Sequence, residues 1–234
     1  MAQVAIIVLA GGQSRRMGQD KALLPLAGRP MLAWVVRRLG AAGLPVLVVT
    51  RPGREQELQE HILLWLEADR PQTAVPAGGV GVAVRVVADR FSGRGPLGGI
   101  HAGLEAAGDG FHLVAACDQP LLTGQLARFL LERAWQSQRA GQGIVDAVVV
   151  RSGGRVEVLP AVLHHRCAQT AERLLARTVR PSLRDLLGAL RQVCVEAWEL
   201  EPMGKPELLL WNVNRPEDVA VALRHLGDTR PGHS

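Results

Sequence analysis

The segment VAIIVLAGGQSRRMGQDK, residues 4–21, joins an apolar run to a glycine-rich, basic stretch. Residues 4–9 are a continuous apolar run, which is typical of a strand buried on both faces of a parallel sheet. Glycines 11 and 12 follow, and without side chains there the backbone can fold closely around a bound group. Three basic residues, Arg15, Arg16 and Lys21, then occur within seven residues of sequence. The stretch therefore predicts a buried strand followed by an anion-binding segment, called here the basic loop (residues 11–21).

The first half of the chain continues by alternating apolar runs with helical patterns. Strands are expected at 46–49, 82–87 and 111–116, and helices at 31–39, 55–68, about 95–107 and about 124–138. Such alternation predicts βαβ units and a parallel sheet. The expected fold is therefore α/β, three-layered and Rossmann-like, with a mostly parallel sheet and helices on both faces.

The second half has shorter elements. Strands 144–150 and 156–162 should form a hairpin around two glycines, with late strands at 193–200 and 207–211 and helices at 168–177, 182–190 and 216–226. Residues 70–81 are rich in Pro, Gly and Ala and predict a loop. We expect one domain over residues 1–227, with residues 228–234 a disordered tail.

Composition narrows the class of protein. The 234 residues are 47% apolar, enough to bury a core without disulfides, and the three cysteines show no paired metal-binding spacing. Residues 4–10 are too short for a membrane span and lack the flanks of an export signal, so we expect a cytoplasmic protein with no membrane partner. The charge of +5 comes from 25 scattered arginines and two lysines, without tyrosine or a nucleic-acid-binding motif. A polyanionic small molecule therefore fits better than nucleic acid.

The basic loop does not follow two common phosphate-binding templates. In a P-loop, Lys and Ser or Thr follow the second glycine, but here Gln19 and Asp20 follow Gly18; the alternate glycines of a dinucleotide-binding turn are also missing. An ordinary polar turn between a strand and a helix is shorter, at about 2–6 residues. Lys21 is one of two lysines in an arginine-rich chain, which indicates that a compact point charge is needed there. We therefore interpret the loop as a triphosphate site.

The segment from Leu9 to Leu32 resembles the corresponding loop of the molybdenum cofactor guanylyltransferases, within the nucleotidyltransferases that act on sugar phosphates and related acceptors. The resemblance implies that Leu9, Ala10, Gly11 and Gly12 surround the nucleoside. It also implies that Arg16 and Lys21 hold the phosphates and take part in catalysis. Gly11 stands where a more general form of the loop has alanine, and this favours guanine over cytosine.

Two aspartates come after buried strands. Asp118, in Ala116-Cys117-Asp118-Gln119-Pro120, suits either a Mg²⁺ ligand or a helix-capping turn on the residues alone. The segment resembles the family's metal-binding motif, so Asp118 is expected to bind Mg²⁺ and to be catalytic. Asp89 lies before a Gly-Pro-Leu-x-Gly-Ile helix start that is also similar to the family's, which implies contact with the nucleotide.

Further similarities extend the resemblance to residue 218. Residues 157–163 are similar to a family segment near the acceptor, and residues 211–218 resemble its closing Asn-x-Asn-Thr-Pro-Glu-Asp, with Asn212 and Asn214 as candidate acceptor ligands. The chain departs from the family at 51–54, where an Asn-rich stretch is usual, at Val158, and at Arg215, which replaces threonine.

The resemblance implies a Mg²⁺-dependent transfer of GMP from GTP to the phosphate of molybdopterin, with release of pyrophosphate. Acceptor molybdoenzymes or other cofactor-biosynthesis proteins are the implied protein partners. Two alternatives stay open: a cytidylyl- or other nucleotidyltransferase of the same fold with a different phosphorylated acceptor, and a nucleotide-binding regulator without turnover. A basic nucleic-acid-binding module would explain the charge but not the basic loop.

Overall fold

The computed structural model describes residues 3–11, 20–68, 82–91, 93–140 and 144–227. The loop expected at 70–81, the tail expected at 228–234 and residues 12–19 of the basic loop lie outside these ranges. None of the described helices is long and apolar enough to cross a bilayer.

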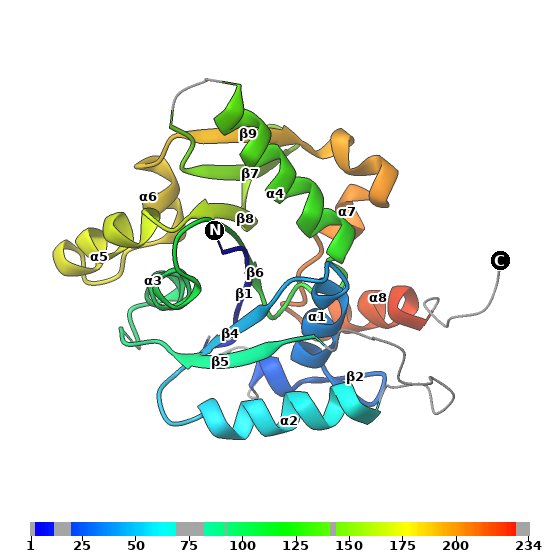
Figure 1. The fold of residues 1–234 in the computed structure, drawn as a ribbon. Helices are drawn as coiled ribbons and strands as arrows, with labels where there is room; N and C mark the ends of the chain where they lie inside the picture. Colours follow the sequence, from blue (N-terminus) through cyan, green and yellow to red (C-terminus); the bar gives the residue numbers. More distant parts are fainter. Residues whose placement is uncertain (1–2, 12–19, 69–81, 92, 141–143, 228–234) are drawn as a thin grey trace.

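Seven strands form one sheet in the order β5-β4-β1-β6-β8-β7-β9 (Figure 1). Their bounds are β1 (Ile6–Leu9), β4 (Val46–Thr50), β5 (Val84–Ala88), β6 (Phe111–Ala116), β7 (Ala147–Ser152), β8 (Arg155–His164) and β9 (Gln192–Glu196). β8 is antiparallel to both of its neighbours, whereas the other four pairs are parallel. The remaining strands therefore end at the same edge of the sheet, which we call the carboxyl edge.

Helices cover both faces of this sheet. One face carries α1 (Met31–Gly40), α2 (Glu55–Ala68) and α4 (Gly124–Arg139), and the other carries α3 (Pro96–Ala107), α5 (Cys167–Arg177) and α6 (Leu183–Gly188). In Figure 1 α3, α5 and α6 lie on the opposite side of the sheet from α1 and α4. The predicted three-layer α/β fold with a mostly parallel sheet is confirmed.

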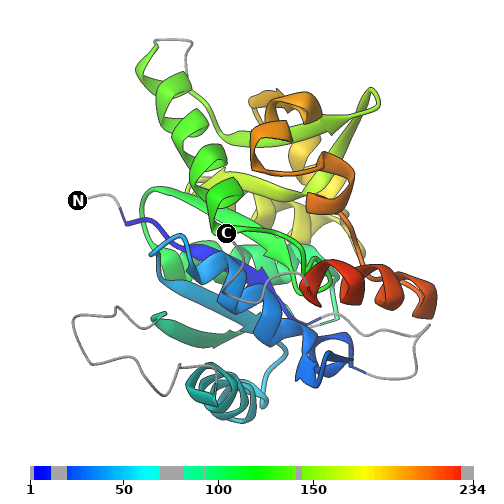
Figure 2. The same cartoon turned by 90° about the vertical axis from the view of Figure 1, so that its right-hand side faces the viewer.

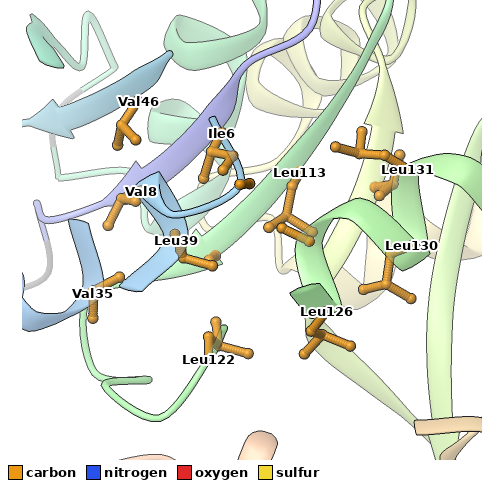
Figure 3. Close-up of a cluster of buried hydrophobic side chains, with 14 of the residues drawn as sticks. Ile6, Val8, Val35, Leu39, Val46, Leu113, Leu122, Leu126, Leu130 and Leu131 are labelled. Atoms are coloured by element: carbon orange, nitrogen blue, oxygen red, sulfur yellow. The ribbon is translucent and has the colours of Figure 1, made fainter. Parts of the chain in front are cut away.

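β1 explains why the core has two halves. Ile6 and Val8 pack with α1 and α4 in one apolar cluster, and Ile7 packs with α3 in the other. Figure 3 shows side chains from β1, β4 and β6 meeting those of α1 and α4. Each fully buried side chain of this size contributes about 1.5–3 kcal/mol relative to exposure. The strand ends at the carboxyl edge are thus held by a packed core.

A third apolar cluster attaches the C-terminal segment to this framework. It joins α8 (Pro216–Gly227) to α1 and to the hairpin of β2 (Pro25–Leu26) and β3 (Arg29–Pro30) (Figure 2). The buried members are Leu26, Met31, Trp34, Leu121, Val213, Ala222 and Leu226. The cluster brings residues 211–214 next to the loop after β6.

Of the two predicted late strands, one was wrong in part and the other was wrong. β9 ends at Glu196, and a 3-10 helix (η2, Ala197–Met203) follows, opened by a reciprocal capping box between Glu196 and Glu199. The apolar run at 207–211 is not a strand, because α7 (Pro206–Leu209) forms a single helical turn with proline at its first position. A short apolar run does not separate strand from buried helix by periodicity alone.

Candidate active site

The carboxyl ends of β1 and β6 lie side by side where the strand order reverses. From β1 the chain moves to β4 and β5 on one side, and then to β6 on the other side. Leu9 pairs with Ala116, and the Cys117 N–H donates to the Leu9 carbonyl at 3.0 Å. Open α/β sheets bind ligands at such a reversal point, beyond the carboxyl ends of the strands. The basic loop and the Cys117-Asp118 turn both begin there.

The residues predicted to surround the nucleoside follow β1 into this place. Leu9 is half-buried, Ala10 is buried and donates its N–H to Val49 O at 2.8 Å, and Gly11 is exposed. A Cβ at Gly11 would approach the Arg51 backbone N only to 3.5 Å, an ordinary contact. The described residues therefore leave room for a side chain at Gly11. Gly12, predicted beside it, lies outside the described residues.

Lys21 brings three separate segments together. It begins the 3-10 helix η1 (Lys21–Leu23), and its Nζ donates to Asp118 Oδ2 at 3.0 Å and to Asn214 Oδ1 at 2.8 Å. The Lys21 side chain is 18% exposed and that of Asp118 20%. The two charges predicted for phosphate and metal thus meet in one ion pair. Arg16, the other predicted phosphate ligand, lies outside the described residues.

Asp118 presents one oxygen that nothing in the described protein satisfies. Its Oδ2 accepts from Lys21, whereas its Oδ1 is buried and lacks a hydrogen-bond partner among the described residues. A buried carboxylate oxygen without a donor is costly, and such groups in native proteins usually have a bound ion or water to explain them. The arrangement fits a metal ligand better than the capping turn considered above.

Gln119, which sequence reasoning did not single out, shapes the turn that carries Asp118. It is fully buried; its Oε1 accepts from Ala116 N at 3.1 Å and its Nε2 donates to Leu159 O at 3.0 Å. The amide thus ties the end of β6 to β8. Its signal in the sequence is only its place beside Asp118, in the turn Cys117-Asp118-Gln119-Pro120 that follows a buried strand.

Of the two candidate asparagines, the structure brings Asn214 to the ion pair. Asp218 Oδ2 accepts from the backbone N–H groups of Asn214 and Arg215, both at 2.8 Å, so this carboxylate caps the segment before α8. The Asn212 side chain instead donates to Leu210 O at 3.0 Å. The backbone of Val213, between them, donates to Asp118 O at 2.8 Å.

Asp89 lies at the carboxyl edge but does not join the ion pair. It follows β5, two strands from β1, and its Oδ1 accepts from Phe91 N at 2.8 Å. The residue is 8% exposed, and burial raises the pKa of its carboxyl group. Gly98 packs against it so closely that a Cβ there would lie 2.6 Å from Oδ1.

A second ion pair was not anticipated. Arg54, in the stretch that departs from the family, pairs with Asp20 immediately before Lys21, and also with Glu57 at 3.0 Å. The Asp20 Oδ1 atom in turn accepts from Ala22 N at 3.0 Å and caps η1.

Other groups suited to nucleophilic or metal chemistry are not assembled in the described part of the chain. Cys117 is buried, and burial raises the pKa of its thiol to about 12, so it is a core residue as expected. The described residues contain no group of three His, Cys, Asp or Glu side chains placed to hold a metal.

Comparison with known proteins gives consistent matches over most of the chain. The family model for the MobA-like NTP transferase domain matches residues 6–193. A "Probable molybdenum cofactor guanylyltransferase" of Pelotomaculum thermopropionicum is 31% identical and covers 99% of this chain and 98% of its own length. The molybdenum cofactor guanylyltransferase of Cereibacter sphaeroides is 33% identical, covering 92% and 93%.

A solved structure supports the fold independently. Molybdopterin-guanine dinucleotide biosynthesis protein A from Archaeoglobus fulgidus superposes with a TM-score of 0.72 at 23% identity, over 96% of this chain and 100% of that one.

Proposed function

Because this chain belongs to the MobA-like NTP transferase family, we propose that it transfers the GMP half of GTP to the phosphate of molybdopterin. The observation that carries the proposal is the convergence of Lys21, Asp118 and Asn214 at the reversal point of the sheet. Its curated relatives bear the name molybdenum cofactor guanylyltransferase, and this favours GTP as donor and the molybdenum cofactor as acceptor.

The nucleoside half of GTP would lie against Leu9, Ala10, Gly11 and Gly12, with Asp89 at the far side. The exposed glycine at position 11 follows a rigid buried strand, so the ligand can approach the backbone closely. Asp89 sits at the same edge, beyond β4. Arg16 and Lys21 would hold the phosphates. Lys21 would break its ion pair with Asp118 to reach them.

Mg²⁺ fits the donor set at Asp118. The buried Oδ1 atom is a hard oxygen without a hydrogen-bond partner among the described residues, and Mg²⁺ is commonly held by one or two carboxylates plus phosphate oxygens and water. When bound, Mg²⁺ supplies positive charge beside the phosphate oxygens, where negative charge builds up during transfer. Asp118 would hold it at the end of β6, in a turn fixed by Gln119.

The chemistry would be an in-line substitution at the α-phosphorus. An oxygen of the acceptor phosphate forms a bond to this phosphorus, the bond to the β-phosphate oxygen breaks, and pyrophosphate leaves. The acceptor phosphate is already ionised near pH 7, so no protein base is needed. Arg16 and Lys21 contribute by neutralising charge and aligning the phosphates. Asn214, beside Lys21, is the candidate to orient the acceptor, and Asn212 is a second candidate.

The wider assignments follow from this role. We infer that residues 1–227 act as one nucleotidyltransferase domain, that the protein works in the cytoplasm, and that acceptor molybdoenzymes or other cofactor-biosynthesis proteins are its partners. Three cysteines without paired spacing agree with a reducing compartment.

The decisive experiment measures pyrophosphate release with GTP, CTP, ATP and UTP, each with and without molybdopterin and Mg²⁺. Release with GTP that depends on molybdopterin is the expected result. Release with CTP in preference to GTP would indicate the cytidylyl alternative. Tight GTP binding without release would indicate a nucleotide-binding regulator.

A further inference from the structure

Arg54 joins two carboxylates that come from different parts of the chain. Its Nε and Nη2 donate to the two carboxylate oxygens of Glu57 at 3.0 Å each, and its Nη1 donates to Asp20 Oδ2. The Arg54 side chain is 14% exposed. A two-pronged pair fixes the plane of the guanidinium group. Glu57, in the first turn of α2, thus orients the guanidinium group so that its Nη1 faces Asp20.

Asp20 holds the backbone next to Lys21 in place. Its Oδ2 accepts from Arg54, and its Oδ1 caps η1 by accepting from Ala22 N at 3.0 Å. The Asp20 carbonyl also accepts from Leu23 N at 3.0 Å. The backbone of Lys21 lies between these anchored points, and its ammonium group reaches Asp118 and Asn214. The first turn of α2 is therefore connected to the centre of the candidate site.

Two simpler roles for Arg54 fit the geometry less well. An exposed Arg–Glu pair one helical turn apart stabilises little, but here the guanidinium also reaches across 34 residues to the basic loop. A direct phosphate contact is disfavoured, because the single charge of Arg54 already faces two carboxylates. A group neutralised in this way attracts an anion weakly.

We propose that Arg54 is a positioning residue, which fixes the end of the basic loop through Asp20 and so aims the Lys21 ammonium group at the triphosphate. The inference rests on the proposed function. It also assigns a role to Arg54 in the segment 51–54, which differs from the Asn-rich stretch of the resembled family.

The first test uses the ligand-free protein and requires no turnover. The chain has two lysines, Lys21 and Lys205, and Lys205 is exposed, so it serves as an internal standard. Limited acetylation followed by mass spectrometry gives the ratio of their rates. Arg54→Ala should raise the Lys21 to Lys205 ratio, because the loosened ion pair exposes the amine. Glu57→Gln, which weakens the clamp but keeps Arg54, should raise it less. An unchanged ratio in both variants overturns the proposal.

The second test is a double-mutant cycle in single-turnover transfer from GTP. Arg54→Ala should slow the reaction on the order of tenfold in the wild-type background and have little effect in Lys21→Ala, because Arg54 acts through Lys21. Arg54→Lys should recover part of the rate. An equal loss in both backgrounds would mean that Arg54 contacts the nucleotide directly, and it overturns the proposal.

A matched control separates this role from general stability. Arg133 of α4 pairs with Glu199 of η2, so Arg133→Ala also removes an arginine from an ion pair and should leave both readouts unchanged. If the wild-type protein transfers no GMP, the proposed function fails. The acetylation ratio still decides whether Arg54 positions Lys21.

Discussion

The Lys21 ammonium group lies 3.0 Å from Asp118 Oδ2, so one ion pair joins the end of the basic loop to the turn after β6 across 97 residues. Both side chains are mostly shielded, at 18% and 20% exposed. The pair neutralises the positive charge of Lys21, which could attract a triphosphate, and the negative charge of Asp118, which could attract a metal ion. The roles of the two residues can be tested separately.

Replacing Asp118 with alanine should remove nearly all turnover and leave the fold intact. The side chain lies at the edge of the core, and the Asp118 carbonyl that accepts from Val213 N at 2.8 Å stays in the variant. Pyrophosphate release across a Mg²⁺ titration, with circular dichroism to check folding, measures the effect. A rate like that of the wild type at ordinary Mg²⁺ would exclude Asp118 from the metal site.

Gly11→Ala should weaken GTP binding more than CTP binding. Among the described residues the added methyl group meets ordinary contacts, the nearest being Arg51 N at 3.5 Å, so we expect little change in stability. We expect GTP affinity to fall on the order of tenfold, or ~1.4 kcal/mol, because a purine would meet the methyl group. Competition binding with both nucleotides is the measurement. Equal losses for GTP and CTP would show that Gly11 does not select the base.

Gly98→Ala tests whether Asp89 touches the nucleotide. A Cβ at Gly98 would lie 2.6 and 2.9 Å from the Asp89 oxygens, so that carboxylate must move. We expect weaker GTP binding with a smaller change in the transfer rate at saturation. Gly188→Ala is the control, since its Cβ meets no atom within 4 Å. If Asp89→Asn and Gly98→Ala both bind GTP normally, Asp89 has a structural role alone.

The sequence predicted the fold well because periodicity reports burial directly. The run at Ile6–Leu9 is apolar on both faces, and helices pack against both sides of this strand. The prediction at 207–211 was wrong because a short apolar run is compatible with either a strand or a buried helical turn, and Pro206 decided for the helix.

The residues of the candidate site were named from the sequence, but their contacts with one another were not predicted. Asp118 and Lys21 were expected near one nucleotide, and their direct pairing depends on the order of strands β1 and β6. Asn214 reaches Lys21 only because a third apolar cluster attaches α8 to α1. The contact of Arg54 with Asp20 could not be predicted from apolar periodicity, because both residues lie in loops.

The buried His112 should make the protein less stable in mild acid. Its ring is fully buried; Nδ1 accepts from Ala5 N at 3.2 Å, and Nε2 lies 2.8 Å from Gly108 O. Burial lowers the pKa of His112 below its ordinary value of 6.5. Below about pH 6.5 the unfolded chain therefore binds more protons than the folded protein. The free energy of unfolding then decreases as the pH is lowered, by at most ~1.4 kcal/mol per pH unit.

Urea unfolding at pH 7.5 and pH 5.5 checks this expectation against His112→Gln. The pKa of His164 is also lowered, chiefly by burial, but that residue is present in both proteins. The wild type should lose more stability than the variant over this range. Equal losses would show that His112 does not carry the pH dependence.

Lys21→Arg separates a specific role of lysine from generic positive charge. The Lys21 ammonium group lies between Asp118 Oδ2 at 3.0 Å and Asn214 Oδ1 at 2.8 Å, where a compact group fits. Arginine has a longer, planar head with fixed donor directions. We expect the variant to lose activity on the order of tenfold or more, or ~1.4 kcal/mol of transition-state stabilisation, nearly as much as Lys21→Ala. Single-turnover kinetics at saturating Mg-GTP measure this, with the exposed Lys205→Arg as the matched control. Full activity in Lys21→Arg would mean that the basic loop needs a positive charge but not a lysine, and it would remove the most sequence-specific support for a triphosphate site.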